Sequence, residues 1–310
     1  MNEGLKTIRL ARHYGFCMGV KRAIRTALRT GADSTGPVNV IHDIVHNDAV
    51  VKSLAERKVG SVASVAEAPG GTIIVPAHGA PPALFEEAER RGLKIVDATC
   101  PLVIKIQRIV RRLIDNGYEI IHFGDLHHDE TRAVVGQAPD GKVVVIHDID
   151  GLRALPQDRP KLALTSQTTA DAVEFARISR EAKRLFPNIK IYNTICNATG
   201  LRQKAVLELA PEVDLMLIVG SRSSANSKRL RDISQTVCKQ AYLINSARDI
   251  DPAWLEGVTA VGVTAGASTP DILAEEVVTW LMAYSGGKAV VIRPGDRNDE
   301  PADLDGAALE

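Results

Sequence analysis

The chain has 310 residues, of which 45% are hydrophobic and 25% charged, as is typical of a folded globular protein with a sizeable core. Lys plus Arg and Asp plus Glu both number 38, so the formal net charge is zero and no global basic field draws the chain to nucleic acid or membrane. No apolar run approaches the length of a membrane span, and the start, MNEGLKTIRLARHYGF, lacks the apolar region of a signal peptide. We therefore expect a cytoplasmic protein, in which any anionic ligand is held by local groups.

Strand-like apolar runs alternate with helical periodicity along almost the whole chain. In chain order the runs are VNVIHDIV, GTIIVPAHG, LKIVDATC, YEIIHFGD, KVVVIHDI, KLALTSQTT, IKIYNTIC, VDLMLIVGS, AYLIN and VTAVGVTAG. Helix candidates between them include PPALFEEAERRG and ADAVEFARISREAKRLF. This alternation predicts an α/β fold with largely parallel sheets.

Three segments repeat one order of features: a strand, a cysteine and a basic amphipathic helix. TIRLARHYGFC leads into MGVKRAIRTALRTG, LKIVDATC into PLVIKIQRIVRRLIDNG, and IKIYNTIC into NATGLRQKAVLELAP. The cysteines recur at intervals near the size of a small α/β module, which predicts three units in tandem. We place them at residues 8–100, 101–196 and 197–284. The remaining residues, 285–310, are rich in Pro, Gly and acidic residues, and we predict a mobile tail.

Cys100 illustrates why this arrangement suits metal binding. Pro101 favours the first turn of a helix, so Cys100 lies at a helix N-terminus, where thiolate is favoured over thiol. One such cysteine alone is more often a small buried residue, but the arrangement recurs at Cys17 and Cys196. Cys238 follows a helical stretch and precedes a strand, so we assign it to the core. If the three units pack around a common axis, the other three cysteines converge.

Three thiolates from separate units favour an iron–sulfur cluster over zinc. Structural zinc sites usually contain close C-x-x-C pairs and four ligands, and the sequence has no such pair. Three cysteines on a four-iron cluster leave one iron without a protein ligand, and that iron offers a place to bind and reduce a substrate.

Polar residues gather directly after predicted strands, where the active sites of α/β proteins lie. The stretch VGSRSSANSKRL supplies hydroxyl, amide and backbone donors before a helix, an arrangement that can hold phosphate oxygens, and GASTPD offers the same through Ser268 and Thr269. His46 and His78 are further donors, and Glu130 is the natural proton source provided that burial raises its pKa. Taken alone, each residue is more often a helix cap or a structural hydrogen-bonding group, so their number and shared placement carry the prediction.

With these residues in view, the chain resembles the LytB/IspH family, the 4-hydroxy-3-methylbut-2-enyl diphosphate reductases that end the methylerythritol phosphate route to isoprenoids. The resemblance covers roughly residues 8–284. It rests on GFCMGV, HN followed by VV, AHG, DATCPLV, HDE with GQ downstream, QTT, TIC.AT..RQ, GS..S.NS.RL and TAGASTP. It implies a trefoil of three α/β domains around a central 4Fe-4S cluster.

The resemblance also implies a role for each matching residue. The cluster ligands would be Cys17, Cys100 and Cys196. The diphosphate-binding residues would be His46, His78, Ser224, Asn226 and Ser268. The residues around the substrate hydroxyl would be His128, Glu130 and Thr168.

The implied reaction is a two-electron reductive dehydroxylation that yields isopentenyl and dimethylallyl diphosphate. Glu130 would help to supply protons, with Thr168 in the relay and His128 beside them. A ferredoxin or flavodoxin would be the electron donor, and no flavin or nicotinamide motif in the sequence contradicts this.

The sequence departs from the family pattern around the acid. Where His-Pro-Glu-Val and then Gly-Thr are usual, the chain has His128-Asp129-Glu130-Thr131 and then Ala133-Val134. Asp129 could compete for protons or repel an anion, and Ala225 stands where some members carry a second serine. A paralogue acting on a related substrate is therefore one alternative. A non-enzymatic iron–sulfur redox sensor and a phosphate-ester enzyme with structural cysteines are two others.

Overall fold

A computed structural model describes residues 4–156, 158–159 and 161–294 of the chain. These residues form three sheets in which every strand pair is parallel, so the predicted α/β class with parallel sheets is confirmed. The chain divides into two compact units, which we describe separately. Within the described ranges, no helix is both long and apolar enough to cross a membrane.

Within the ranges Met1–Met18, His46–Asp48 and Asn197–Glu310, the described residues form unit 1, which contains a five-stranded sheet in the order β11-β10-β12-β1-β13. The strands are β1 (Thr7–Leu10), β10 (Leu215–Val219), β11 (Gln240–Ile244), β12 (Ala260–Ala265) and β13 (Val290–Ile292). The helices are α8 (Asn197–Leu209), α9 (Ala225–Val237) and α10 (Asp271–Tyr284), with the short 3-10 helices η2 (Ala210–Glu212), η3 (Ala247–Asp249) and η4 (Pro252–Leu255).

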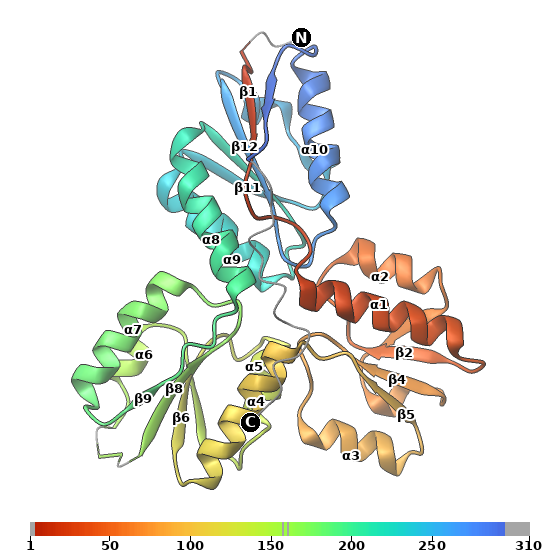
Figure 1. Ribbon diagram of the computed structural model, residues 1–310, viewed down its shortest axis with the longest axis vertical. Coiled ribbons are helices and arrows are strands. Elements are labelled where there is room, and N and C mark those ends of the chain that lie inside the picture. Colours follow the sequence, from red (N-terminus) through yellow and green to blue (C-terminus); the bar gives the residue numbers. More distant parts are fainter. Residues whose placement is uncertain (1–3, 157, 160, 295–310) are drawn as a thin grey trace. The chain divides into compact units, whose positions relative to one another are not determined.

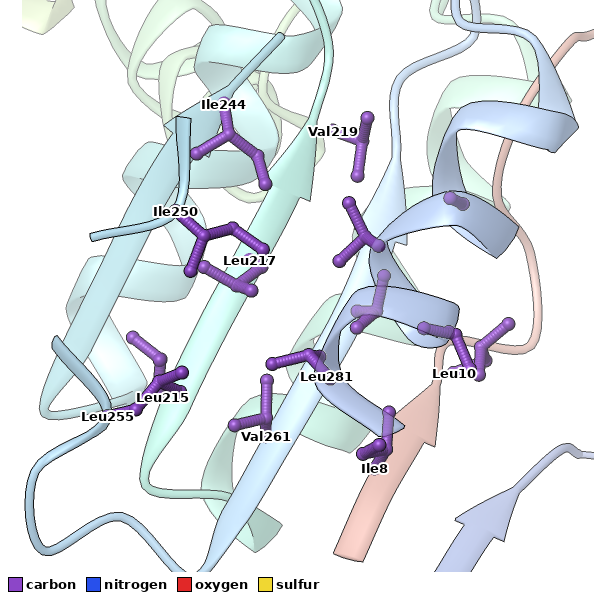
Figure 2. Packing of buried hydrophobic residues seen from close by; sticks show 14 of the residues in the cluster. Ile8, Leu10, Leu215, Leu217, Val219, Ile244, Ile250, Leu255, Val261 and Leu281 are labelled. Atoms are coloured by element: carbon purple, nitrogen blue, oxygen red, sulfur yellow. The ribbon is translucent and has the colours of Figure 1, made fainter. Parts of the chain in front are cut away.

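Strand β10 shows why the sheet of unit 1 is covered on both faces. All five of its residues are buried, and successive side chains point to opposite faces. Leu215, Leu217 and Val219 pack in the cluster that includes Leu281 of α10, as Figure 2 shows. Met216 and its neighbours on the other face pack against α8 and α9. A continuous apolar run is thus the expected signature of this strand.

The pairing of β1 departs from three tandem units. β1 pairs with β12 and β13, so the start of the expected first unit, 8–100, belongs to the same sheet as residues of the expected third unit, 197–284. β13 itself lies within 285–310, which we expected to be a tail. The apolar residues of Val290–Ile292 supply the edge strand that extends the sheet beyond β1. The rest of that predicted tail, 295–310, lies outside the described residues.

Unit 2 comprises Gly19–Val45 and Ala49–Cys196 and contains two four-stranded sheets (Figure 1). The first has the order β3-β2-β4-β5, with β2 (Val38–Ile41), β3 (Val59–Val62), β4 (Thr72–Val75) and β5 (Lys94–Asp97). The elements that accompany it are α1 (Met18–Asp33), α2 (Asp48–Ala55), η1 (Val65–Glu67) and α3 (Pro82–Arg90). β3 was not predicted, because VGSV is short and contains Gly and Ser.

The second sheet of unit 2 has the order β7-β6-β8-β9. Its strands are β6 (Glu119–Phe123), β7 (Val143–Ile146), β8 (Leu162–Ser166) and β9 (Lys190–Ile191). Its helices are α4 (Pro101–Asp115), α5 (Asp129–Val135), α6 (Ile149–Arg153) and α7 (Ala172–Leu185). One apolar cluster joins the sheet to α4 and α5, and another joins it to α6 and α7, so helices cover both faces (Figure 1).

Candidate functional site

Three cysteines stand directly before helices, as the sequence predicts. Cys17 precedes α1, Cys100 is the N-cap residue of α4, and Cys196 precedes α8. Each side chain is half-buried, and none of the four cysteines, all within the described ranges, forms a disulfide. The partial positive charge of a helix N-terminus suits an anionic ligand.

Cys238 occupies the core position predicted for it. It caps the C-terminus of α9 and is 9% exposed. Its Sγ donates to the carbonyl oxygens of Val213 and Gln240, at 3.5 and 3.3 Å. A buried thiol engaged with backbone carbonyls is poorly placed to bind a metal.

Each of the three other cysteines is hydrogen-bonded through its backbone to a loop that follows a parallel strand. The N–H of Cys17 donates to the carbonyl of Ala267 at 3.1 Å, within unit 1. Within unit 2, the N–H of Cys100 donates to Ala77 at 2.9 Å and that of Cys196 to Thr168 at 3.1 Å. Ala267 directly precedes Ser268, and Ala77 directly precedes His78; both Ser268 and His78 are predicted site residues. The third acceptor, Thr168, is itself a predicted site residue.

The loop that carries Cys17 is held on both sides. Gly15 has a positive φ of 76°, and a Cβ there would lie 1.8 Å from the Asp271 carboxylate, so only glycine fits. That carboxylate accepts from the N–H of Phe16 at 3.1 Å. From the other side, Arg202 donates two hydrogen bonds to the Gly15 carbonyl, at 3.2 and 2.8 Å. These bonds determine the path of the chain into Cys17.

Arg202 is a residue that the sequence reasoning missed. It is 1% exposed, although it is an arginine. A signal was present in the sequence: Arg202 precedes Ala205, Val206 and Leu209 by three, four and seven positions, the spacing of the buried face of α8. A charged side chain on an apolar face needs a built partner, which is here the Gly15 carbonyl.

Ser224 and Ser268, two of the predicted diphosphate-binding residues, contact each other in unit 1. Ser224 is the N-cap residue of α9, and its hydroxyl accepts from the N–H of Ser227 at 3.3 Å. The Ser268 hydroxyl lies 3.2 Å from the Ser224 hydroxyl and 3.4 Å from the carbonyl oxygen of His46. The neighbouring Thr269 differs, because its hydroxyl donates to the Val219 carbonyl at 3.2 Å and faces the sheet.

Asn226 is 4% exposed, and within the described structure neither atom of its side-chain amide has a hydrogen-bond partner. The hydroxyl of Ser227 is also buried without one. A Cβ at Gly220 or Gly266 would lie 2.2 or 2.0 Å from that hydroxyl, so both positions require glycine. Buried polar groups in native proteins are normally paired, so this cradle of donors is suited to an anionic ligand.

Glu130 and Thr168 form the acidic half of the predicted site, in unit 2. Glu130 is 3% exposed, and its carboxylate accepts from the Thr168 N–H at 2.6 Å and from the Thr168 hydroxyl at 2.5 Å. Burial raises the pKa of Glu130 to about 7, although both hydrogen bonds act in the opposite direction. The condition that the sequence analysis attached to this acid, a pKa raised by burial, is met.

Glu130 lies in the first turn of α5. His128 is the N-cap residue of α5, and its Nδ1 accepts from the N–H of Glu130 at 3.2 Å. Asp129 faces a different group: its carboxylate lies 3.5 Å from Nε2 of His78 and is hydrogen-bonded to Arg132. Burial alone would raise the pKa of Asp129, but His78 and Arg132 outweigh it and the pKa is lowered. Asp129 is therefore ionised near neutral pH, and Glu130 is the carboxyl that can carry a proton.

Gln167 ties the loop after β6 to the loop after β8 and was not predicted as a site residue. Its side-chain oxygen accepts from the N–H of Asp125 at 3.1 Å and from the Thr131 hydroxyl at 3.3 Å. Its side-chain nitrogen donates to the Thr169 hydroxyl at 2.8 Å. Thr131 follows Glu130, and Thr169 follows Thr168. Gln167 therefore supports both residues of the hydrogen-bonded Glu130–Thr168 pair.

The predicted residues thus fall into one connected set in each unit. In unit 1 the set is Cys17, His46, Ser224, Asn226 and Ser268. In unit 2 the set is Cys100, His78, His128, Glu130, Thr168 and Cys196, joined through Asp129. Together with the fold, they define an α/β protein with three half-buried cysteines before helices, buried unpaired polar groups suited to an anion, and a buried carboxylic acid.

The chain belongs to the family described as LytB protein, whose family model matches residues 8–282. It is 40% identical over 285 residues to the 4-hydroxy-3-methylbut-2-enyl diphosphate reductase of Methylibium petroleiphilum, covering 91% of this chain and 86% of the relative. It is 42% identical to the reductase of the same name from Mycobacterium leprae, covering 89% and 84%.

Solved structures give the same result. The chain superimposes with a TM-score of 0.89, at 32% identity, on the E-1-hydroxy-2-methyl-but-2-enyl-4-diphosphate reductase from Plasmodium falciparum, covering 94% of this chain and 93% of the other. A structure of (E)-4-hydroxy-3-methyl-but-2-enyl diphosphate reductase, described as the terminal enzyme of the non-mevalonate pathway, matches with a TM-score of 0.65 and 35% identity over 90% of this chain and 100% of the other. The sequence resemblance to this family is confirmed.

Proposed function

We propose that the protein is a 4-hydroxy-3-methylbut-2-enyl diphosphate reductase, which removes the allylic hydroxyl of its substrate to form isopentenyl and dimethylallyl diphosphate. Curated relatives at about 40% identity over most of the chain carry this name, and the LytB family covers residues 8–282. The observation in this chain that supports the proposal most strongly is the buried Glu130, whose pKa of about 7 suits a proton donor at neutral pH.

We assign Cys17, Cys100 and Cys196 as the ligands of a 4Fe-4S cluster. The residues fit such a group, since three half-buried cysteines stand before helices with their backbone N–H groups already engaged, while Cys238 is held in the core. When bound, the cluster would pass on, one at a time, the two electrons that the reduction consumes and that an external donor supplies. The domain limits near residues 100 and 196 belong to the same proposal.

Glu130 supplies a proton to the departing hydroxyl in this proposal. Hydroxide is a poor leaving group, and a carboxyl with a pKa of about 7 is protonated often enough near neutral pH to release it as water. Thr168 holds the carboxyl by two hydrogen bonds, and its hydroxyl can pass a proton between Glu130 and the substrate oxygen. His128 positions Glu130 by accepting the N–H of that residue.

The diphosphate is bound by the side chains of His46, His78, Ser224, Asn226 and Ser268. The buried amide of Asn226 and the paired hydroxyls of Ser224 and Ser268 support this role, because they are donors held within a glycine-lined cradle. A ferredoxin or flavodoxin is the proposed electron donor, and the cytoplasmic location stays a prediction of the sequence.

The deciding experiment is turnover of the hydroxymethylbutenyl diphosphate by anaerobically purified protein, with dithionite and a viologen as reductant. We expect brown protein that forms both five-carbon diphosphates. Brown protein without turnover would contradict the enzyme and favour an iron–sulfur sensor or a paralogue with another substrate. Colourless protein without iron would contradict the cluster assignment.

A further inference from the structure

Asp129 stands where proline is usual in the family pattern. Three consecutive residues of one turn reach three different partners. His128 accepts the N–H of Glu130, Asp129 contacts His78, and Glu130 accepts from Thr168. Asp129 therefore joins the turn that carries the acid to the β4 loop that carries His78.

The contact between this turn and the β4 loop is tightly built. A Cβ at Gly136, at the end of α5, would lie 2.5 Å from the Pro81 side chain. Gly79 has a positive φ of 77°, and a Cβ there would lie 2.7 Å from the side-chain nitrogen of Gln107 on α4. Gly136 thus permits close packing of the end of α5 on the loop after β4, and Gly79 permits close packing of that loop on α4. The elements that carry Asp129 and His78 are therefore held together by packing within the unit.

The Asp129 carboxylate lies between two side chains that can carry positive charge. Its carboxylate is 15% exposed and faces Nε2 of the buried His78 on one side and the guanidinium of Arg132 on the other. His42, at the end of β2, acts on the same carboxylate electrostatically and has a positive φ of 54°, which is unusual for a residue with a side chain. Arg132 balances the charge of Asp129. With His78 protonated, the group therefore retains one positive charge to attract an anion.

We propose that Asp129 is a positioning residue that keeps His78 protonated and oriented as an anion-binding cation, with Arg132 neutralising the carboxylate so that it does not repel the anion. A carboxylate beside an imidazole favours the charged imidazolium. The inference rests on the proposed function, because it takes His78 to contact the substrate diphosphate. It differs from the competing idea that Asp129 weakens anion binding.

The test uses anaerobic holoenzyme, inorganic diphosphate as the probe, and NMR titration of the His78 ring, identified with His78→Gln. In Asp129→Asn we expect the His78 titration to move to lower pH and the Kd for diphosphate at pH 7.5 to rise about tenfold. KM should rise while kcat changes by less than about twofold, because Glu130 keeps both bonds to Thr168.

Arg132→Gln should differ from Asp129→Asn in the direction in which the His78 titration moves. The variant keeps Asp129 beside His78 but removes the balancing charge from a side chain that is 56% exposed. We expect weaker diphosphate binding with the His78 titration unchanged or moved to higher pH. Asp150→Asn is the matched control, since it removes a carboxylate that is 84% exposed on α6 of the same unit, and it should change neither reading.

Tighter or unchanged diphosphate binding in Asp129→Asn, or an unchanged His78 titration, overturns the inference. The NMR titration of His78 requires neither turnover nor diphosphate. It therefore tests the role of Asp129 separately from the proposed function. If the unaltered enzyme turns over but Asp129→Asn leaves His78 unchanged, only the role of Asp129 fails. If the unaltered enzyme neither binds diphosphate nor turns over, the proposed function fails, and the anion-binding role of His78 fails with it.

Discussion

Thr168 holds the carboxylate of Glu130 by two hydrogen bonds, from its backbone N–H at 2.6 Å and from its hydroxyl at 2.5 Å. Two effects oppose each other in this pair. Burial favours the neutral carboxyl, and the two donors favour the carboxylate. Burial is the larger effect and leaves the pKa of Glu130 at about 7, so that this group can both hold and release a proton near neutral pH.

The first prediction concerns the catalytic acid. Glu130→Gln should lower the single-turnover rate by about 100- to 10,000-fold, because glutamine retains the shape but carries no acidic proton. Iron content and substrate affinity should stay close to those of the unaltered protein. The control is Asp129→Asn, which should retain kcat. If Asp129→Asn is inactive while Glu130→Gln is active, the acid is Asp129 and not Glu130.

The second prediction concerns the pH dependence of stability in unit 2. The pKa of Glu130 is raised from 4.5 to about 7, so the folded state holds a proton that the unfolded state has lost between these values. The free energy of unfolding should therefore fall by about 3 kcal/mol as the pH rises through this window. Glu130→Gln should remove the fall and be the more stable protein at pH 8.

His122 should act in the opposite direction. It is fully buried, its Nδ1 lies 2.9 Å from the Thr165 hydroxyl, and burial lowers its pKa from 6.5 to about 4. The contribution of neutral His122 to the free energy of unfolding is present above pH 6.5 and is lost as the pH falls towards 4. In Glu130→Gln, the free energy of unfolding should therefore rise as the pH rises from about 4 to 6.5. Hydrogen exchange of β6 and β8 amides measures both slopes, and a pH-independent Glu130→Gln would contradict the His122 prediction.

The third prediction concerns the cysteines. Cys17→Ser, Cys100→Ser and Cys196→Ser should each lose most of the bound iron, whereas Cys238→Ser should keep it. The reason is that the first three are half-buried before helices, while the Cys238 thiol is buried against two carbonyls. Iron and sulfide analysis of the four anaerobic preparations decides the assignment. Equal loss in all four would refute it.

The fourth prediction concerns Arg202. Arg202→Met leaves the Gly15 carbonyl without its charged donor, and the free energy of unfolding should fall by about 3 kcal/mol. Amides of Phe16 and Cys17 should exchange faster, and iron should be retained less well. Lys204→Met is the control on the same helix, because Lys204 is 74% exposed and should change little. Unchanged exchange at Phe16 in Arg202→Met would show that the loop is held by other contacts.

Local sequence patterns determined most of the fold class and the identity of the candidate residues. Continuous apolar runs such as Leu215–Val219 predicted buried parallel strands, because both faces of such strands must be covered. The order of strand, cysteine and helix separated Cys17, Cys100 and Cys196 from Cys238, and the structure keeps that distinction. These predictions succeeded because each depends on periodicity or on neighbours within a few residues.

Only the tertiary structure decided which distant groups meet. No local pattern shows that β1 pairs with β12, because a parallel partner is chosen by packing across the whole unit. The same holds for Asp129 and His78, and for Arg202 and Gly15. Adjacent carboxyls illustrate the point most sharply. The sequence pointed to Glu130 as the acid only on the condition that burial raises its pKa. In the structure, burial raises the pKa of Glu130, and the charges of His78 and Arg132 lower that of Asp129.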